Sequence, residues 1–168
     1  IITSGGISMG DRDFTKEAFA NLGMQLHFDK VDIKPGKPTA FGTIGEKVVI
    51  NLPGNPLASM VNYEIFVRAA IRRMSGMNAY FHHTLSTQTK EDFTLRPGKH
   101  TVRLGIFDGE TFMPFRKQLP GMISPLEASN AMLITMPEVS RLEKGKSVKI
   151  LPISWDLTAC EKEDFFSR

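Results

Sequence analysis

The chain has 168 residues, which is long enough to bury a sizeable core. Hydrophobic residues make up 41% and charged residues 23%, so the composition is that of a globular protein and excludes a disordered one. A formal net charge of +3 is too small for the dense basic surface that nucleic-acid binding needs, so no nucleic-acid partner is expected.

The first residues alternate between strand and helix signals, as in an α/β domain. The chain begins in Ile1-Ile2, which is shorter than the ~5–6 residues of a typical strand. We therefore expect it to be the C-terminal piece of a longer protein. A glycine loop at residues 3–13 leads into a helix over 14–22 that Asp13 caps, and alternation at 24–28 predicts a half-buried strand.

A hairpin and a long helix complete this first part. Residues 41–44 and 47–52 flank Gly45-Glu46, which indicates a hairpin. A helix is predicted from residue 57 to residue 75, directly after Pro56. Its apolar residues nearly encircle it, which predicts that the helix is buried between a sheet and other parts of the intact protein.

Beyond Met77 the pattern changes to short β-like runs separated by proline and glycine turns. Asp108-Gly109 between two apolar runs is a strong hairpin signal, and residues 131–136 and 147–151 are expected to be further strands. Five or six short strands in about 75 residues predict a small barrel.

The predicted fold class is therefore α/β: an incomplete doubly wound domain followed by a small C-terminal β-barrel. The expected boundaries place the α/β domain at residues 1–76 and the barrel at residues 77–155. Residues 156–168 are expected to form a charged C-terminal tail.

Two glycine-bearing loops have the strand–loop–helix form in which backbone N–H groups and a helix N-terminus face a bound anion. The first contains Gly5-Gly6, which permit positive φ and close ligand approach, although a tight turn alone would use them equally well. The second is Leu52-Pro53-Gly54-Asn55-Pro56. There Asn55 either caps the following helix or contacts a ligand, and Pro56 suits the first helical turn.

Charged residues accompany these loops. Asp11 and Asp13 are hard oxygen donors suited to Mg²⁺ held partly by substrate phosphates, with helix capping as the alternative role of Asp13. Three lysines lie within eight residues: Lys30, Lys34 and Lys37. Pro35 and Pro38 stiffen their loop, which favours a binding role over scattered surface lysines. Together these features predict a site for a phosphorylated ligand and a hard metal ion.

The sequence gives little support for a histidine metal site, a disulfide or a membrane span. The four histidines lack metal-ligand spacing, and His82-His83 is expected to be a solvated pair at a domain junction. The single Cys160 excludes an internal disulfide and fits a reducing compartment. Since no apolar run approaches the ~20 residues of a membrane span, we expect a cytoplasmic protein with no membrane partner.

In their order and spacing, these motifs resemble the molybdopterin molybdotransferase family, which includes MoeA and the E domain of gephyrin. The matching stretches are residues 3–16 (TSGGISMGDRDFTK), residues 34–38 (KPGKP) with Phe41-Gly42, and residues 52–56 (LPGNP). More loosely, residues 128–131 and 142–148 fit the C-terminal barrel of that family.

The resemblance implies a transferase of molybdenum cofactor biosynthesis. Such enzymes take adenylylated molybdopterin and molybdate, insert the molybdenum and release AMP, with Mg²⁺ as the cation. The resemblance also implies a homodimer, contact with the molybdopterin adenylyltransferase, and an isolated fragment without activity, because the N-terminal domains complete the site across the dimer.

The family's functional residues fall on positions of this chain. Its active-site acid falls on Asp13, which with Asp11 is the expected metal site, and its two functional lysines fall on Lys30 and Lys34. The expected catalytic residues are Asp13, Lys30 and Lys34. The expected substrate-binding residues are Gly5, Gly6, Ser8, Lys37, Pro53, Gly54, Asn55 and Pro56.

Two other functions remain open from the sequence. A molybdopterin adenylyltransferase-like enzyme would share the glycine loop, but a barrel after the α/β domain is not expected there. A non-catalytic molybdopterin- or nucleotide-binding scaffold would keep the pocket without the chemistry. The presence of Asp13, Lys30 and Lys34 together favours an enzyme.

Overall fold

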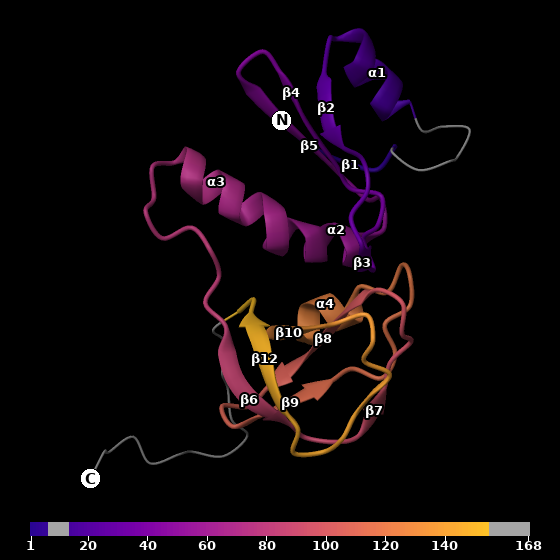
Figure 1. Cartoon of the computed structure of the whole chain (residues 1–168), viewed down its shortest axis with the longest axis vertical. Coiled ribbons are helices and arrows are strands. Elements are labelled where there is room, and N and C mark those ends of the chain that lie inside the picture. Colours follow the sequence, from indigo (N-terminus) through magenta and orange to yellow (C-terminus); the bar gives the residue numbers. More distant parts are fainter. Residues whose placement is uncertain (7–13, 155–168) are drawn as a thin grey trace.

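The computed structural model describes residues 1–6 and 14–154. An α/β part built on one sheet lies at one end of the molecule and a β-barrel lies at the other, with a long helical segment between them (Figure 1). The predicted combination of an α/β part and a small barrel is therefore confirmed.

The α/β part contains a four-stranded sheet of order β1-β5-β4-β2. Strand β1 (Ile2–Ser4) runs parallel to β5 (Lys47–Leu52). Strand β4 (Ala40–Ile44) is antiparallel to β5, and β2 (Gln25–Phe28) is antiparallel to β4. The predicted hairpin is confirmed, since β4 and β5 are joined at Gly45, which has a φ of +57°.

Helices cover both faces of this sheet, as in a doubly wound fold. On one face, Ile50 and Leu52 pack with Val67 of the long helical segment. On the other face, Ala40 and Asn51 line a small cavity together with Ala20 of α1 (Thr15–Asn21). Two layers thus enclose the centre of the sheet.

The edge of the α/β part is more exposed than the sequence pattern predicts. All four residues of β2 are exposed, with Leu26 at 53% and Phe28 at 39%, so the prediction of a half-buried strand is wrong. Leu26 lines the small cavity beside α1 and Phe28 stacks on Phe41, with ring centroids 5.6 Å apart, but these contacts leave both side chains largely exposed. The Phe14 residue that precedes α1 makes no side-chain cap bond, and the predicted cap Asp13 lies outside the described residues.

The predicted long helix consists of three consecutive helical segments. They are α2 (Pro56–Asn62), the π-helical turn η1 (Tyr63–Val67) and α3 (Arg68–Met74). The stretch ends at Gly76, which has a φ of +78°. Its first half is buried within this chain, whereas α3 contains no buried residue and Met74 is 69% exposed. Burial of α3 by other parts of a longer protein stays a prediction.

The second part is a closed five-stranded barrel. Its strands are β6 (Leu85–Thr89), β8 (His100–Phe107), β9 (Thr111–Pro114), β10 (Ala131–Thr135) and β12 (Ser147–Pro152). The β10–β8 pairing closes the ring. The short strands β7 (Phe93–Thr94) and β11 (Arg141–Leu142) pair with each other. The helix α4 (Ser124–Ala128) was not predicted.

The barrel has one core inside and a second core against the long helix. Phe112, Leu133 and Ile150 lie in the inner cluster. Leu57 and Val61 of α2 pack with Val102, Leu104 and Met132 on the outer side of the barrel wall. Because both parts contribute to this second core, α2 ties the α/β part to the barrel. Within the described residues, no helix is long and apolar enough to cross a membrane.

The predicted turn at Asp108-Gly109 joins β8 to β9, and its carboxylate is well bonded. Partial burial alone would raise the pKa of Asp108. Hydrogen bonds from Lys90 (2.7 Å) and from the amides of Thr111 (2.7 Å) and Glu110 (3.1 Å) outweigh it and hold the pKa of Asp108 well below its ordinary value. The charged form of Asp108 therefore stabilises this turn.

Replacing Asp108 with asparagine is expected to change how stability depends on pH. Since its pKa is lower in the folded than in the unfolded chain, the contribution of Asp108 is present above the ordinary value of 3.8 and is lost as the pH falls below it. The gap in free energy of unfolding between wild type and Asp108→Asn should be greatest near neutral pH, begin to narrow as the pH falls below about 4, and close only as the pH approaches the lower pKa of the folded chain. Urea denaturation across this range measures it, with Glu46→Gln in the exposed β4–β5 turn as the control. A gap independent of pH would contradict the assignment.

Candidate functional site

The two glycine-bearing loops lie against each other. They follow β1 and β5, which are parallel neighbours, so both loops leave the same edge of the sheet. The Gly5 amide donates to Leu52 O (3.0 Å), and Ser4 Oγ donates to Pro53 O (3.0 Å). A Cβ placed on Gly54 would lie only 3.3 Å from Gly5 Cα. The sequence motifs therefore converge on one place.

The glycines of the first loop are required by its conformation. Gly5 and Gly6 have φ values of +89° and +70°, so the predicted positive φ is confirmed. A Cβ on Gly6 would overlap Thr15 Oγ1, because Gly6 lies against the start of α1. The amide of Thr15 donates to Gly6 O (3.1 Å) and fixes this approach.

The second loop ends at the N-terminus of α2. Asn55 Oδ1 accepts a hydrogen bond from the Leu57 amide (3.0 Å), and Pro56 occupies the first helical turn, so the capping role of Asn55 is confirmed. Ser59 Oγ lies 3.2 Å from Ser4 Oγ of the first loop. The helix N-terminus, which carries a partial positive charge, therefore adjoins the glycine loop.

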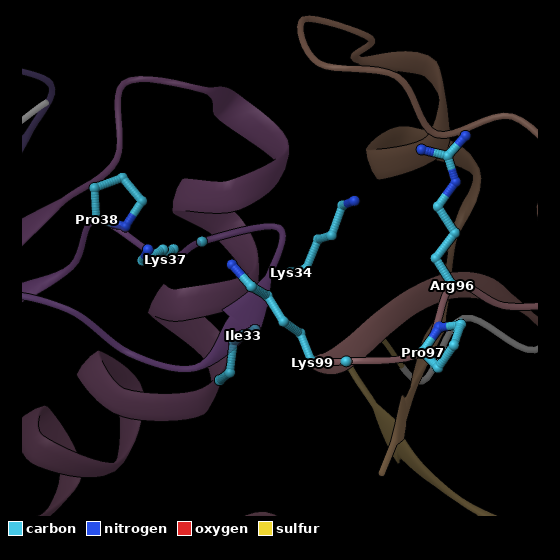
Figure 2. A pocket seen from close by; sticks show the side chains of 9 residues that line it. Ile33, Lys34, Lys37, Pro38, Arg96, Pro97 and Lys99 are labelled. Carbon is cyan, nitrogen blue, oxygen red and sulfur yellow. The ribbon is translucent and has the colours of Figure 1, made fainter. Parts of the chain in front are cut away.

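A cationic cleft lies between the lysine loop (residues 30–38) and the barrel. Its volume is about 480 Å³, and four basic side chains line it: Lys34, Lys37, Arg96 and Lys99. No acidic side chain from residues 1–6 or 14–154 lines it. Figure 2 shows the side chain of Lys34 extending toward the side of Arg96 and that of Lys99 extending toward Lys37. Four cations without a counter-charge create a field that attracts anions.

Strand pairing brings the two sides of the cleft together. The short strand β3 (Ile33–Lys34) is parallel to β8, with Ile33 opposite His100 and Lys34 opposite Thr101. His100 Nδ1 also lies 3.1 Å from Asp32 O. The lysine loop is therefore joined to the barrel sheet, directly beside the turn that carries Arg96 and Lys99.

Four other predicted site residues are not found in the cleft or in the glycine loops as described. Lys30 is exposed and does not line the cleft. Ser8, Asp11 and Asp13 lie outside the described residues. Within residues 1–6 and 14–154, no group of three histidine, cysteine or acidic side chains could hold a metal ion. Sequence reasoning missed Arg96 and Lys99, because no local signal relates them to a loop about 60 residues earlier.

The histidine pair is only partly solvated. His82 is 13% exposed, and its Nε2 lies 3.0 Å from Glu64 O and 3.1 Å from Glu64 Oε2. Glu64, buried on η1, also accepts from Arg68 (2.8 Å). The prediction of a solvated pair is therefore wrong for His82 and right for the exposed His83. His82 fixes the segment between α3 and β6 to the long helix.

Family models match both parts of the chain. Residues 1–73 match the probable molybdopterin binding domain, and residues 87–153 match the MoeA C-terminal region, domain IV. The Molybdenum cofactor synthesis protein cinnamon of Drosophila melanogaster is 30% identical over 92% of this chain and 26% of its own length. The Molybdopterin molybdenumtransferase of Staphylococcus aureus (strain COL) is 30% identical over 97% of this chain and 39% of its own length. The chain thus spans between about a quarter and two fifths of these relatives.

Solved structures have a similar fold. The molybdopterin biosynthesis moeA protein of Pyrococcus horikoshii matches with a TM-score of 0.74 at 21% identity, over 90% of this chain and 36% of that chain. The molybdenum cofactor biosynthesis protein of Pyrococcus furiosus matches with a TM-score of 0.68 at 21% identity, over 86% of this chain and 55% of that chain. At this identity the likeness concerns the fold alone.

Proposed function

Since the chain belongs to the MoeA/gephyrin-type family, we propose that it is the C-terminal part of a molybdopterin molybdenumtransferase. The proposed reaction inserts molybdenum from molybdate into adenylylated molybdopterin and releases AMP. Molybdate and the pyrophosphate-linked substrate are both anionic. Catalysis would therefore consist mainly of positioning these groups and neutralising their charge.

The cationic cleft is the observation that supports this proposal most directly. An oxyanion there would meet Lys34 and Lys37 from the α/β part and Arg96 and Lys99 from the barrel. Lys ammonium and Arg guanidinium groups form strong charge-assisted hydrogen bonds with such anions. The glycine loops and the N-terminus of α2 would supply further backbone N–H groups for phosphate oxygens.

Mg²⁺ and the protein partners belong to the same proposal. Asp11 and Asp13 have the hard oxygen donors that Mg²⁺ prefers, and the ion would offset phosphate charge when bound. We further propose a cytoplasmic homodimer that contacts the molybdopterin adenylyltransferase. Lys30 is proposed to act near the site without lining the cleft.

An assay of the full-length protein tests the proposed reaction. The protein is incubated with adenylylated molybdopterin and Mg²⁺ while the molybdate concentration is varied, and AMP and bound molybdenum are measured. We expect AMP release that depends on molybdate, and none from the isolated 168 residues. Pyrophosphate formation from ATP and molybdopterin would instead indicate an adenylyltransferase. Substrate binding without AMP release would indicate a scaffold.

A further inference from the structure

A buried amide connects the long helix to the lysine loop. Asn62, the last residue of α2, is 0% exposed. Its Nδ2 donates a hydrogen bond to Gly36 O (2.9 Å), which also accepts one from Thr39 Oγ1 (2.9 Å). Gly36 lies between Lys34 and Lys37 in the sequence. The hydrogen bond of Asn62 therefore reaches the backbone between the two lysines that line the cleft.

Packing alone does not account for an amide at this position. A carbonyl oxygen only accepts hydrogen bonds, so the NH₂ group of Asn62 must face Gly36 O. This leaves Asn62 Oδ1 buried and without a hydrogen-bond partner among the described residues. An unpaired buried acceptor is destabilising, whereas an apolar side chain of similar size would fill the same space without that cost. The donor group of Asn62 is what an apolar residue could not supply.

The loop is shaped to meet this side chain. Gly36 has a φ of +126°, and a Cβ placed there would overlap Asn62 Nδ2. The glycine therefore lets the loop backbone approach the helix closely enough for the bond. The π-helical turn η1 begins at the next residue, Tyr63, and such turns occur frequently at functional sites.

We propose that Asn62 is a positioning residue for the lysine loop, holding the Gly36 carbonyl so that Lys34 and Lys37 face the cationic cleft. This inference rests on the proposed function, in which the cleft binds an oxyanion substrate. Asn62 itself does not line the cleft and acts through the loop. Its loss should therefore weaken anion binding while the charges of the lysines remain.

The test is Asn62→Leu in the full-length protein, with molybdate as the varied substrate. Leucine fills the space and removes both the donor and the unpaired acceptor. We expect KM for molybdate to rise about tenfold or more, because misplacement of binding groups is costly, with kcat within about twofold of wild type. The melting temperature should not fall. Thr39→Val removes the second donor to Gly36 O and should also raise KM for molybdate. If Asn62→Leu does not fold, the same measurement on Thr39→Val tests the proposal.

A matched control separates positioning from simple loss of stability. Val67→Ala truncates another fully buried residue of the long helical segment, which packs on the four-stranded sheet and not on the barrel, and should lower the melting temperature with KM for molybdate unchanged. The inference is overturned if Asn62→Leu raises this KM no more than Val67→Ala does. If Lys34→Gln raises KM while Asn62→Leu and Thr39→Val do not, the positioning role alone fails. If none of the three raises it, the assignment of the cleft fails and the positioning role fails with it.

Discussion

Replacing Lys34 with glutamine in the full-length protein is expected to lower molybdenum insertion about ten- to a hundredfold, since a charge-assisted hydrogen bond contributes ~1.5–3 kcal/mol. Glutamine keeps polarity and nearly the same length but removes the positive charge that Lys34 brings to the cationic cleft. Lys34 is an exposed residue, so the melting temperature should hardly change. The rate of AMP release and a thermal melt measure the two effects.

Lys149→Gln is the matched control for this substitution. Lys149 is an exposed lysine on β12 that does not line the cleft, so the same chemical change should leave the rate of AMP release at the wild-type value. Full turnover by Lys34→Gln would show that the cleft does not bind substrate. A melting temperature lowered as much as by a core truncation would make Lys34 a structural residue.

Phe112→Ala should cause a large loss of stability, lowering the free energy of unfolding by about 3–5 kcal/mol. Phe112 is 0% exposed and packs in the inner core of the barrel with Leu133 and Ile150. Truncation removes its buried surface and leaves a cavity that the closed barrel cannot easily collapse. Urea denaturation followed by circular dichroism measures the change.

Phe81→Ala provides the same substitution at an exposed position. Phe81 is 76% exposed, so its truncation should change the free energy of unfolding by less than about 0.5 kcal/mol. Equal effects of the two substitutions would contradict the placement of Phe112 in the barrel core.

Local signals were sufficient to predict the hairpins and the positive φ of the first glycine loop. Gly45 and Gly109 mark tight turns between apolar runs, and both turns are present because turn chemistry depends on neighbouring residues only. The loops at Gly5 and Gly54 meet because they follow strands that pair in parallel. The two turns depend on a few residues close together in the sequence, whereas the meeting of the loops depends on the distant pairing of β1 with β5.

Features that depend on distant pairing could not be predicted. Nothing near Lys34 in the sequence indicates that β3 pairs with β8, so Arg96 and Lys99 could not be assigned to the cleft. Periodicity predicted one helix but not the π-helical turn inside it, because apolar residues nearly encircle this helix and hide the shift that one extra residue makes in the pattern. In β2 the pattern identified apolar residues such as Leu26, but a pattern does not reveal whether another layer covers them.

The pairing of β3 with β8 has a consequence for the whole molecule. One pair of cations in the cleft belongs to the α/β part and the other pair belongs to the barrel, so like charges repel across the boundary when no anion is bound. A bound oxyanion would relieve this repulsion and bridge the two halves. If anion binding favours contact between the two parts, thermodynamic reciprocity requires the converse. An interaction that stabilises contact between the barrel and the α/β part would then raise the affinity of the cleft for its anion. If the cleft binds an oxyanion as proposed, its occupancy and the arrangement of the two parts would be coupled.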